Sequence, residues 1–196
     1  MLCRHDAAGM RAHREALLTV YEEVYADELD APFFAPDRFW ERLESYAQWP
    51  GFSLVTLHDD DLIGYSLGYR LPPRSAWWRG FLGDVEPQEL VEDGERTFAV
   101  TQLMVLPARQ RQGHGRALHD ALLRRRPERR ATLLVKPDNV PARTAYLSWG
   151  WELFGQVRPF EDAPVYDSLM LTSMPDQGGE RGFQGDRGGE PGGIFG

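Results

Sequence analysis

Apolar and polar positions follow helical spacing in two segments near the N-terminus. From Met10 to Tyr25 the apolar residues lie on one helical face, and a second helix is expected from Pro36 to Trp49, beginning near its proline. Residues 52–71, FSLVTLHDDDLIGYSLGYRL, then form two β-rich runs around three aspartates, which predicts a hairpin with a solvated turn. We find no convincing strand before the first helix.

The second half of the pattern alternates strands and helices. TFAVTQLMV, residues 97–105, predicts a buried strand, and a bend containing two glycines leads from it to a helix over 113–125 that Pro127 ends. ATLLV predicts a further strand, Asn139 to Ser148 a helix, and WELFGQV and YDSLML two closing strands. The expected architecture is α/β, a mixed sheet with helices on its faces.

Composition favours one packed domain followed by a different kind of segment. The chain has 196 residues, of which 42% are apolar and 12% aromatic, enough for one core. From Pro175 onward, glycines are mixed with polar and charged residues, which predicts a disordered tail. We therefore expect a domain over residues 1–174 and a glycine-rich tail over 175–196. With no apolar stretch of membrane-spanning length and no signal-peptide pattern, we expect a cytoplasmic protein that does not bind a membrane.

The net charge of −8 is unevenly distributed. Residues 11–70 are rich in Asp and Glu, whereas residues 106–143 are rich in arginine. Two surfaces of opposite sign, or two solvated faces, would both produce this pattern. Because the chain is acidic overall, we expect no nucleic-acid partner.

The glycine bend at 113–115 is the first sign of chemistry. A glycine-rich bend that enters a helix presents backbone N–H groups and a positive dipole end, which suits a phosphate group. A nucleotide P-loop would need lysine and then serine or threonine after its second glycine, where this chain has Arg116 and Ala117. The dinucleotide pattern would need a third glycine or alanine where this chain has Leu118. Both nucleotide motifs are therefore absent.

A different pair of motifs does fit. Residues 110–115, QRQGHG, match [RQ]-x-x-G-x-[GA], and about 25 residues later NVPARTAYLSWGW, residues 139–151, matches N-x-x-A-x-x-x-Y-x-x-x-G-[FW]. In this order and spacing the two motifs resemble those of the GCN5-related N-acetyltransferases (GNAT), which bind acetyl-CoA. The resemblance covers about residues 52–171 and is specific from 97 to 151. It implies a GNAT-like, mostly antiparallel central sheet flanked by helices, with a splayed strand pair at the acetyl-CoA site.

The resemblance also implies roles for particular residues. Backbone N–H groups around residues 103–105 would stabilise the oxyanion, the bend would hold the pyrophosphate, and the start of the later helix would meet the pantetheine arm. The implied acetyl-CoA contacts are Leu103, Met104, Val105, Gln110, Arg111, Gln112, Gly113, His114, Gly115, Arg116, Asn139 and Ala142. Asn139 also suits the N-cap of its helix. Tyr146, on the same helical face as Ala142, is either a core side chain or, as the resemblance implies, the general acid for the departing thiolate.

The general base is left open by the sequence. Several relatives carry a glutamate in the strand where this chain has Thr101 and Gln102. An amine acceptor must lose a proton before it attacks, so a base or a water chain is required, while a metal is not. The candidate bases are Glu95, Asp84, Glu22 and Glu23.

The expected function is transfer of an acetyl group from acetyl-CoA to a primary amine of a cationic small molecule. In the family that the chain resembles, the first two helices and the loop that joins them usually wall the acceptor pocket. Acids in this segment, ahead of Phe33 and Phe34, therefore predict a cationic acceptor. These acids are Glu22, Glu23, Asp27, Glu28 and Asp30. The alternatives are acetylation of a protein or peptide N-terminus or lysine, and a non-catalytic CoA-binding regulatory module. Trp77 and Trp78 either line the substrate pocket or close the core, and the protein is expected to be a monomer or a homodimer.

Overall fold

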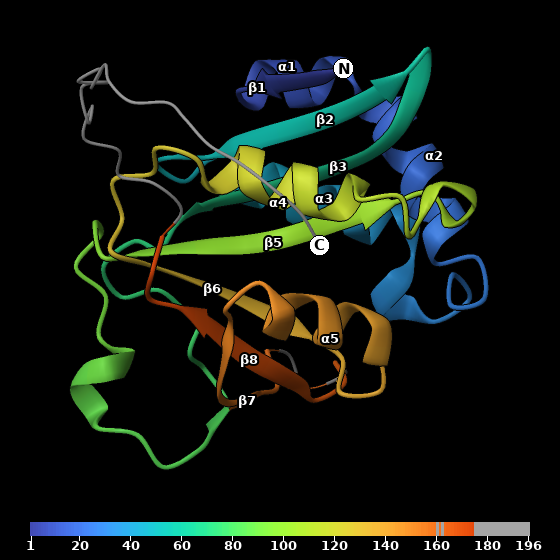
Figure 1. The fold of residues 1–196 in the computed structure, drawn as a ribbon. Coiled ribbons are helices and arrows are strands. Elements are labelled where there is room, and N and C mark those ends of the chain that lie inside the picture. Colours follow the sequence, from blue (N-terminus) through green and yellow to red (C-terminus); the bar gives the residue numbers. More distant parts are fainter. Residues whose placement is uncertain (160, 162, 175–196) are drawn as a thin grey trace, which may run out of the picture.

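The computed structural model describes residues 1–159, 161 and 163–174, and one sheet organises them (Figure 1). Its strands lie in the order β1-β2-β3-β5-β6-β8-β7-β4, and every neighbouring pair is antiparallel except β5 and β6. The strands are β1 (Leu2–His5), β2 (Ser53–Asp59), β3 (Asp61–Arg70), β4 (Phe81–Leu82), β5 (Thr97–Val105), β6 (Arg130–Val135), β7 (Glu152–Val157) and β8 (Tyr166–Leu171). The predicted mixed, mostly antiparallel sheet is confirmed. The predicted tail over 175–196 lies outside the described residues.

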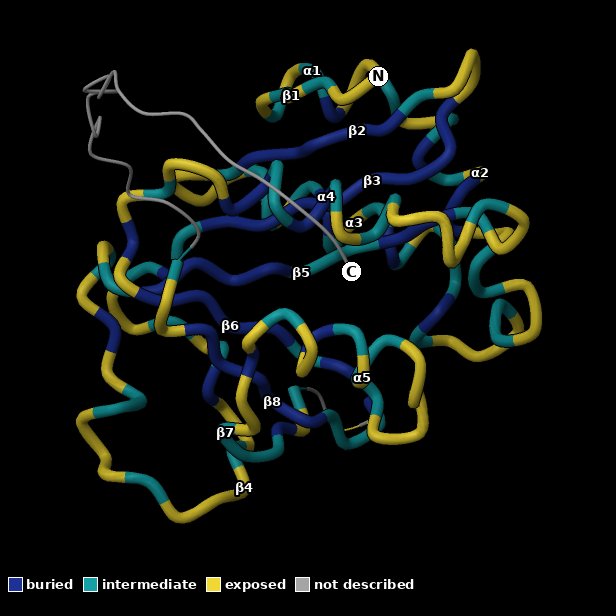
Figure 2. The backbone as a smooth tube through the Cα atoms, viewed as in Figure 1, coloured by how far each residue is buried: buried dark blue, intermediate teal, exposed yellow. Residues whose placement is uncertain are grey.

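Helices cover both faces of the sheet. The α-helices are α1 (Ala7–Ala12), α2 (Arg14–Val24), α3 (Pro36–Tyr46), α4 (His114–Leu123) and α5 (Val140–Ser148), and the 3₁₀ turns are η1 (Pro32–Phe34), η2 (Pro87–Leu90) and η3 (Pro107–Arg109). Side chains of α4 and α5 pack into one core with Val100, whereas Leu17 of α2 and Phe39 of α3 pack into another with Leu67. The middle strands are buried along most of their length and the connecting loops are exposed (Figure 2). Within the described residues, no helix is both long and apolar enough to cross a bilayer.

The predicted elements differ from the structure mainly near the N-terminus. β1 was not expected, because it has only four residues and its exposed and partly buried positions carry no apolar run. The helix predicted from Met10 to Tyr25 is divided at His13, where α1 ends and α2 begins. The aspartate turn at 59–61 is exposed and joins β2 to β3, as expected.

The parallel pair β5 and β6 separates partway along its length. Pairing runs over four positions, from Thr97 opposite Arg130 to Val100 opposite Leu133. At this point β5 also bulges, because Gln102 and Val100 pair with adjacent residues of β3 and Thr101 between them has no partner there. Beyond the bulge, β5 continues beside β3 alone, so the backbone groups on its other edge face a gap.

A buried polar network holds the paired end of β5 and β6 together. The Oε1 atom of Glu92 accepts hydrogen bonds from Trp78 Nε1 (2.9 Å), Thr97 Oγ1 (3.0 Å) and Arg130 Nη2 (3.1 Å). Arg130 also donates through Nε to Thr97 (2.8 Å) and through Nη1 to the more exposed Glu89 (2.9 Å). Because Glu92 and Arg130 are both buried, each depends on the other to offset its lost hydration.

Three histidines gather at the sheet edge formed by β1 and β2. The ring centroids of His5 and His13 lie 4.5 Å apart and those of His13 and His58 lie 6.3 Å apart. The Nε2 atoms of His5 and His58 lie 2.9 and 3.0 Å from the Oγ1 atom of Thr56. Burial, followed by repulsion from His13, lowers the pKa of both His5 and His58; Asp6 opposes this at His5, and the N-terminal ammonium adds to it at His58.

The network predicts a large loss of stability when Glu92 is replaced by alanine. Arg130 would then stay buried with only Glu89 as a charged partner, so we expect the free energy of unfolding to fall by about 3 kcal/mol or more. Glu89→Ala is the matched control. It should lower the free energy of unfolding by about 1 kcal/mol or less, since Glu89 is half-exposed. Urea denaturation of the variants measures both values, and similar losses in the two would contradict the assigned role of Glu92.

The histidine cluster predicts acid sensitivity. Since the folded-state pKa values of His5 and His58 lie below the unfolded value of about 6.5, the unfolded chain binds more protons as the pH falls. The stability that the neutral rings contribute is complete above about pH 6.5 and is lost as the pH falls through the folded-state values. Urea midpoints measured from about pH 8 to 5 should decline less in the double variant His5→Gln/His58→Gln than in the parent. Equal declines would assign the acid sensitivity to other groups.

Candidate active site

A cavity of about 800 Å³ begins in the gap between β5 and β6 and extends below α2, η1 and α3. One wall consists of β5 residues 100–104, and the opposite wall consists of β6 residues 133–135. Asn139, Ala142 and Tyr146 of the α5 segment close it from a third side. The splayed pair therefore encloses a space of the size that small-molecule sites usually have. Of the predicted strand contacts, Leu103 and Met104 line the cavity, whereas Val105 does not.

The glycine bend forms an open cradle at the start of α4. Gly113 is the N-cap residue in a left-handed conformation (φ 82°), and no side chain caps the helix. A Cβ atom at Gly113 would meet nothing within 4 Å, and one at Gly115 would meet only Leu103 Cδ2 at 3.7 Å and Trp149 Cη2 at 3.8 Å. The backbone N–H groups of the first turn are thus accessible to an anion, as the pyrophosphate of CoA requires.

The side chains of the bend mostly support the bend itself. Gln110 donates from Nε2 to the carbonyl of Val105 (3.1 Å), and Gln112 donates to the carbonyl of Ala108 (3.4 Å). Arg116 pairs with Asp120 four residues on (2.7 Å). Arg111 is exposed with a positive φ of 59°, and His114 is partly buried. None of residues 110–116 lines the cavity, so any contact that they make with CoA is with the part of the cofactor outside it.

Helix α5 holds Tyr146 at the cavity. Asn139 caps the helix, as predicted, and its Oδ1 atom accepts from the backbone N–H of Ala142 (3.2 Å). Arg143 pairs through Nε with the buried Asp167 of β8 (2.7 Å), which fixes the helix against the sheet. Burial, followed by repulsion from Tyr25, raises the pKa of Tyr146, so its phenol is protonated at neutral pH. Among the described residues, its hydroxyl has no hydrogen-bond partner and remains available to a ligand.

The two sequence motifs are joined by a chain of hydrogen bonds. Trp151 donates from Nε1 to His119 Nε2 (2.9 Å), and His119 Nδ1 lies 2.8 Å from Asp120, the partner of Arg116. Burial is the main cause that lowers the pKa of His119, so the ring is neutral and can accept from Trp151. Sequence reasoning missed this role of His119, because its partner Trp151 lies 32 positions away in the chain.

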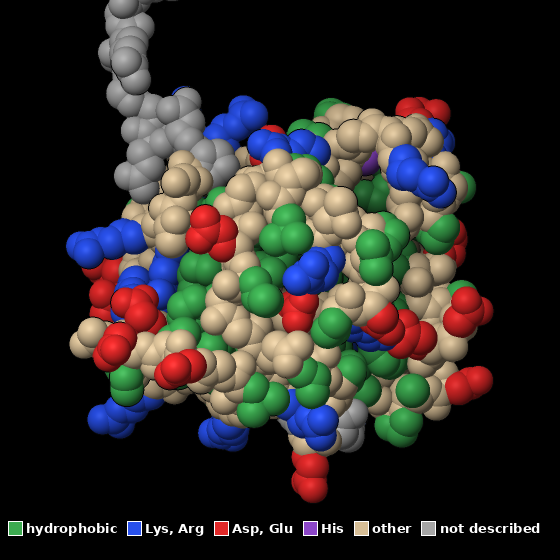
Figure 3. Space-filling view, turned by 60° about the horizontal axis from the view of Figure 1, so that its bottom comes forward, with side chains coloured by type: hydrophobic (Ala, Val, Ile, Leu, Met, Phe, Trp, Pro, Cys, Tyr) green, Lys and Arg blue, Asp and Glu red, His purple; other side chains and the backbone are tan. Residues whose placement is uncertain are grey.

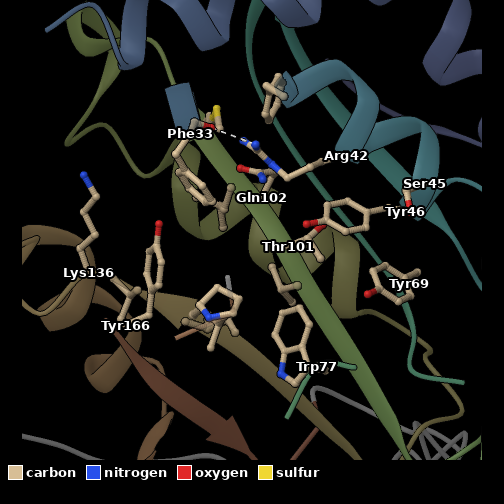
Figure 4. A pocket seen from close by; sticks show the side chains of 18 of the residues that line it. Phe33, Arg42, Ser45, Tyr46, Tyr69, Trp77, Thr101, Gln102, Lys136 and Tyr166 are labelled. Carbon is tan, nitrogen blue, oxygen red and sulfur yellow. Dashed lines mark hydrogen bonds between the residues drawn. The ribbon is translucent and has the colours of Figure 1, made fainter. Parts of the chain in front are cut away.

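Several aromatic side chains line the cavity. Phe33, Tyr46, Tyr69, Trp77 and Tyr166 line it from five different parts of the chain (Figure 4). Trp77 thus lines the pocket, whereas Trp78 belongs to the buried network of Glu92. No motif in the sequence could have identified this set, since the fold alone brings its members together.

Three partly buried charged side chains also line the cavity and were not predicted as a group. Arg42 of α3 donates from Nη1 to the carbonyl of Phe33 (2.9 Å). Glu28, in the loop after α2, pairs with Lys136 at the end of β6. This ion pair connects the loop after α2 to the end of β6.

The acids on which a cationic acceptor was predicted mostly face solvent. Glu22, Glu23, Asp27 and Asp30 are exposed and do not line the cavity, which leaves Glu28 alone among the five. On the face seen in Figure 3, acidic and basic side chains are intermingled, with no division into two regions. The proposed bases Glu95, Asp84, Glu22 and Glu23 are likewise exposed and outside the cavity. These positions do not favour any of the four as a base in direct contact with the acceptor, and the sequence does not show which face of each segment turns inward.

Comparison with known proteins agrees with the fold. The family model described as Acetyltransferase (GNAT) family matches residues 15–151. None of the curated proteins matches the chain. A GNAT-family protein from Desulfovibrio desulfuricans is 20% identical, with a TM-score of 0.58 over 88% of this chain and 98% of that chain. These values confirm the predicted GNAT-like fold.

Two further solved structures of similar fold are named for their N-acetyltransferase activity. One is the PaiA N-acetyltransferase from Thermoplasma acidophilum in complex with coenzyme A (10% identity, TM-score 0.54, 88% of this chain and 99% of that chain). The other is the ribosomal-protein-alanine N-acetyltransferase from Brucella melitensis (14% identity, TM-score 0.56, 88% of this chain and 99% of that chain). At such identities the likeness establishes the fold alone.

The cradle predicts that Gly115→Glu abolishes CoA binding without unfolding the protein. The chain leaves room for a Cβ atom at this position, but the added carboxylate would repel the pyrophosphate and occupy its place. Gly113 is the poorer test because its positive φ makes any substitution strained. Ala108→Glu adds the same charge at an exposed position of η3 and should bind CoA nearly normally. Calorimetry measures binding and circular dichroism the fold; wild-type affinity in Gly115→Glu would place the cofactor elsewhere.

Proposed function

The chain belongs to the acetyltransferase (GNAT) family, and we propose that it transfers an acetyl group from acetyl-CoA to a primary amine. The observation that carries the proposal is that the open α4 cradle lies next to Leu103, which lines the cavity between the splayed strands together with Tyr146. A non-catalytic CoA-binding module is less well supported, because Tyr146 is available at the place where the departing thiol would lie. A cytoplasmic location and a monomeric or homodimeric state stay predictions from the sequence.

Each part of the site fits one part of acetyl-CoA, which supplies an acetyl group activated as a thioester. The N–H groups at the start of α4 would hold the pyrophosphate, while Ala142 leaves space in the gap for the pantetheine arm. The unpaired edge of β5 beyond Thr101 presents backbone N–H groups to the carbonyl oxygen, where negative charge develops.

Proton transfers involving the amine, a base and Tyr146 complete the reaction. The acceptor ammonium first loses one proton to a base, because only the neutral amine has a free electron pair. As the N–C bond forms and the C–S bond breaks, Tyr146 gives its proton to the sulfur, and the remaining surplus proton on nitrogen restores the phenol. The products are the amide, the CoA thiol and one released proton.

We place the base at Glu28. Of the carboxylates that line the cavity among the described residues, Glu28 is partly buried whereas Asp138 is exposed. Burial is the main cause that raises the pKa of Tyr25 and Tyr166, and the charge of Glu28 adds to the rise in both. Glu28 would accept the first proton directly or through water, and its ion pair with Lys136 would have to loosen as the carboxylate becomes neutral.

The proposed acid predicts a selective loss of turnover in Tyr146→Phe. The substitution preserves packing and removes only the hydroxyl, so kcat should fall by about 10²- to 10⁴-fold while the affinity for acetyl-CoA changes little. Tyr65→Phe is the matched control: Tyr65 is buried, donates to Met104 Sδ (3.3 Å) and does not line the cavity. Thiol release with saturating amine measures kcat. Unchanged turnover in Tyr146→Phe, with chemistry limiting the rate, would exclude Tyr146 as the acid.

A further inference from the structure

Arg42 is a partly buried cation that faces the cavity without a carboxylate partner. Its Nη1 atom donates to the carbonyl of Phe33, and its guanidinium lies over the rings of Phe33 (4.7 Å) and Phe39 (5.8 Å). Within the part of the chain that the structure describes, no Asp or Glu lies within salt-bridge distance of it. Since a guanidinium has five N–H donors, most of them remain available to a ligand.

The other charges of the cavity do not neutralise Arg42. Glu28 is already paired with Lys136. The loop before β4 adds two exposed arginines to the lining, Arg74 and Arg79, against the exposed Asp138. These cations are separate from the α4 cradle, whose residues do not line the cavity, so they are not explained by the pyrophosphate of CoA. The lining of the cavity therefore carries excess positive charge.

The position of Arg42 relates this charge to the reacting centre. In Figure 4 its side chain extends from α3 toward Gln102 of β5, which is next to the bulge where β5 leaves β6. An anionic group bound by Arg42 would consequently lie near the amine that attacks the thioester. A carboxylate on the carbon next to the amine fits this arrangement, and a guanidinium can bind it through two parallel hydrogen bonds.

Aromatic side chains flank the remaining space. Tyr46 and Tyr69 stack with their ring centroids 5.2 Å apart, and Trp77 lines the same cavity. Flat apolar walls of this kind bind an aromatic or large aliphatic group, through buried area and ring stacking.

Given the proposed acetyl transfer, on which this step rests, we propose that the acceptor is a free α-amino acid with an aromatic or large apolar side chain. Arg42 binds its carboxylate, the α-amine points to the gap between β5 and β6, and the side chain packs against Tyr46, Tyr69 and Trp77. This assignment replaces the cationic acceptor expected from the sequence. A peptide N-terminus has no carboxylate at this position and would leave Arg42 unpaired.

An amine panel with acetyl-CoA tests the assignment by thiol release. The pairs to compare are free phenylalanine with phenethylamine and with phenylalaninamide, which differ only at the carboxylate. We expect kcat/KM for phenylalanine to exceed those of both analogues by about 10- to 100-fold, as a charge-assisted hydrogen bond provides. Spermidine and a short peptide with an N-terminal alanine represent the cationic and the macromolecular alternatives.

Variants of Arg42 test whether this residue causes the preference for an acceptor with an α-carboxylate. Arg42→Gln should lower kcat/KM for phenylalanine by about 10- to 100-fold and leave phenethylamine nearly unchanged. Arg42→Lys keeps the charge but loses the planar fork, so it should recover only part of the loss. Arg14→Gln is the matched control, because Arg14 is exposed on α2 and does not line the cavity. Circular dichroism confirms folding, and calorimetry with N-acetylphenylalanine measures binding without catalysis.

The possible outcomes distinguish a failure of the amino-acid assignment from a failure of the proposed acetyl transfer. If phenethylamine, spermidine or the peptide is acetylated at least as well as phenylalanine, the amino-acid assignment is overturned while acetyl transfer stands. If Arg42→Gln affects phenylalanine and phenethylamine equally, Arg42 does not bind the carboxylate. If CoA binds but no amine in the panel releases thiol, the proposed acetyl transfer itself fails.

Discussion

The separation of β5 from β6 after four paired positions is the constraint on which the rest of the site depends. Parallel strands that stayed paired would satisfy each other's backbone groups and leave no space between them. The bulge at Thr101 turns β5 away, and the buried network around Glu92 and Arg130 keeps the opposite end closed. The polar network and the cavity therefore depend on each other. Because β5 and β6 are held together at the end that contains Thr97 and Arg130, β5 can leave β6 beyond Val100 and keep an unpaired edge there.

The helices that carry the two motifs are positioned by polar contacts between distant residues. The chain from Trp151 through His119 and Asp120 connects the segment after α5 to α4, so the cradle and the catalytic helix are held in a fixed relation. The pair of Arg143 with Asp167 ties α5 to the sheet from the other side. Since each of these buried groups has its partner, the site gains rigidity without a large desolvation cost. Geometry held in this way is what the proposed acid role of Tyr146 would require.

Local signals in the sequence predicted much of the fold and the cofactor side of the site. The bounds of β5 and β8 follow from their apolar runs, and Asn139 was recognisable as a helix cap because it acts on its own neighbours. The acceptor side could not be predicted in this way. Whether Glu22 or Arg42 faces the cavity depends on how α2 and α3 rotate on the sheet, and the partners of His119 and Asp167 come from distant segments. Four-residue β1 was missed because an edge strand so short needs no apolar pattern.

The place of β8 in the sheet has a consequence for biosynthesis. β8 is the last described strand in the sequence, yet it lies between β6 and β7. While the chain is being made, both motifs leave the ribosome before residues 166–171, at a time when β6 still has an unpaired edge and Arg143 lacks Asp167. A nascent chain of this length exposes an apolar strand edge that other chains can pair with, a stage at which chaperones commonly act. The open edge of β6 and the side chain of Arg143 therefore gain these partners only when β8 inserts, so a nascent chain that stops before residue 166 would carry both motifs without them.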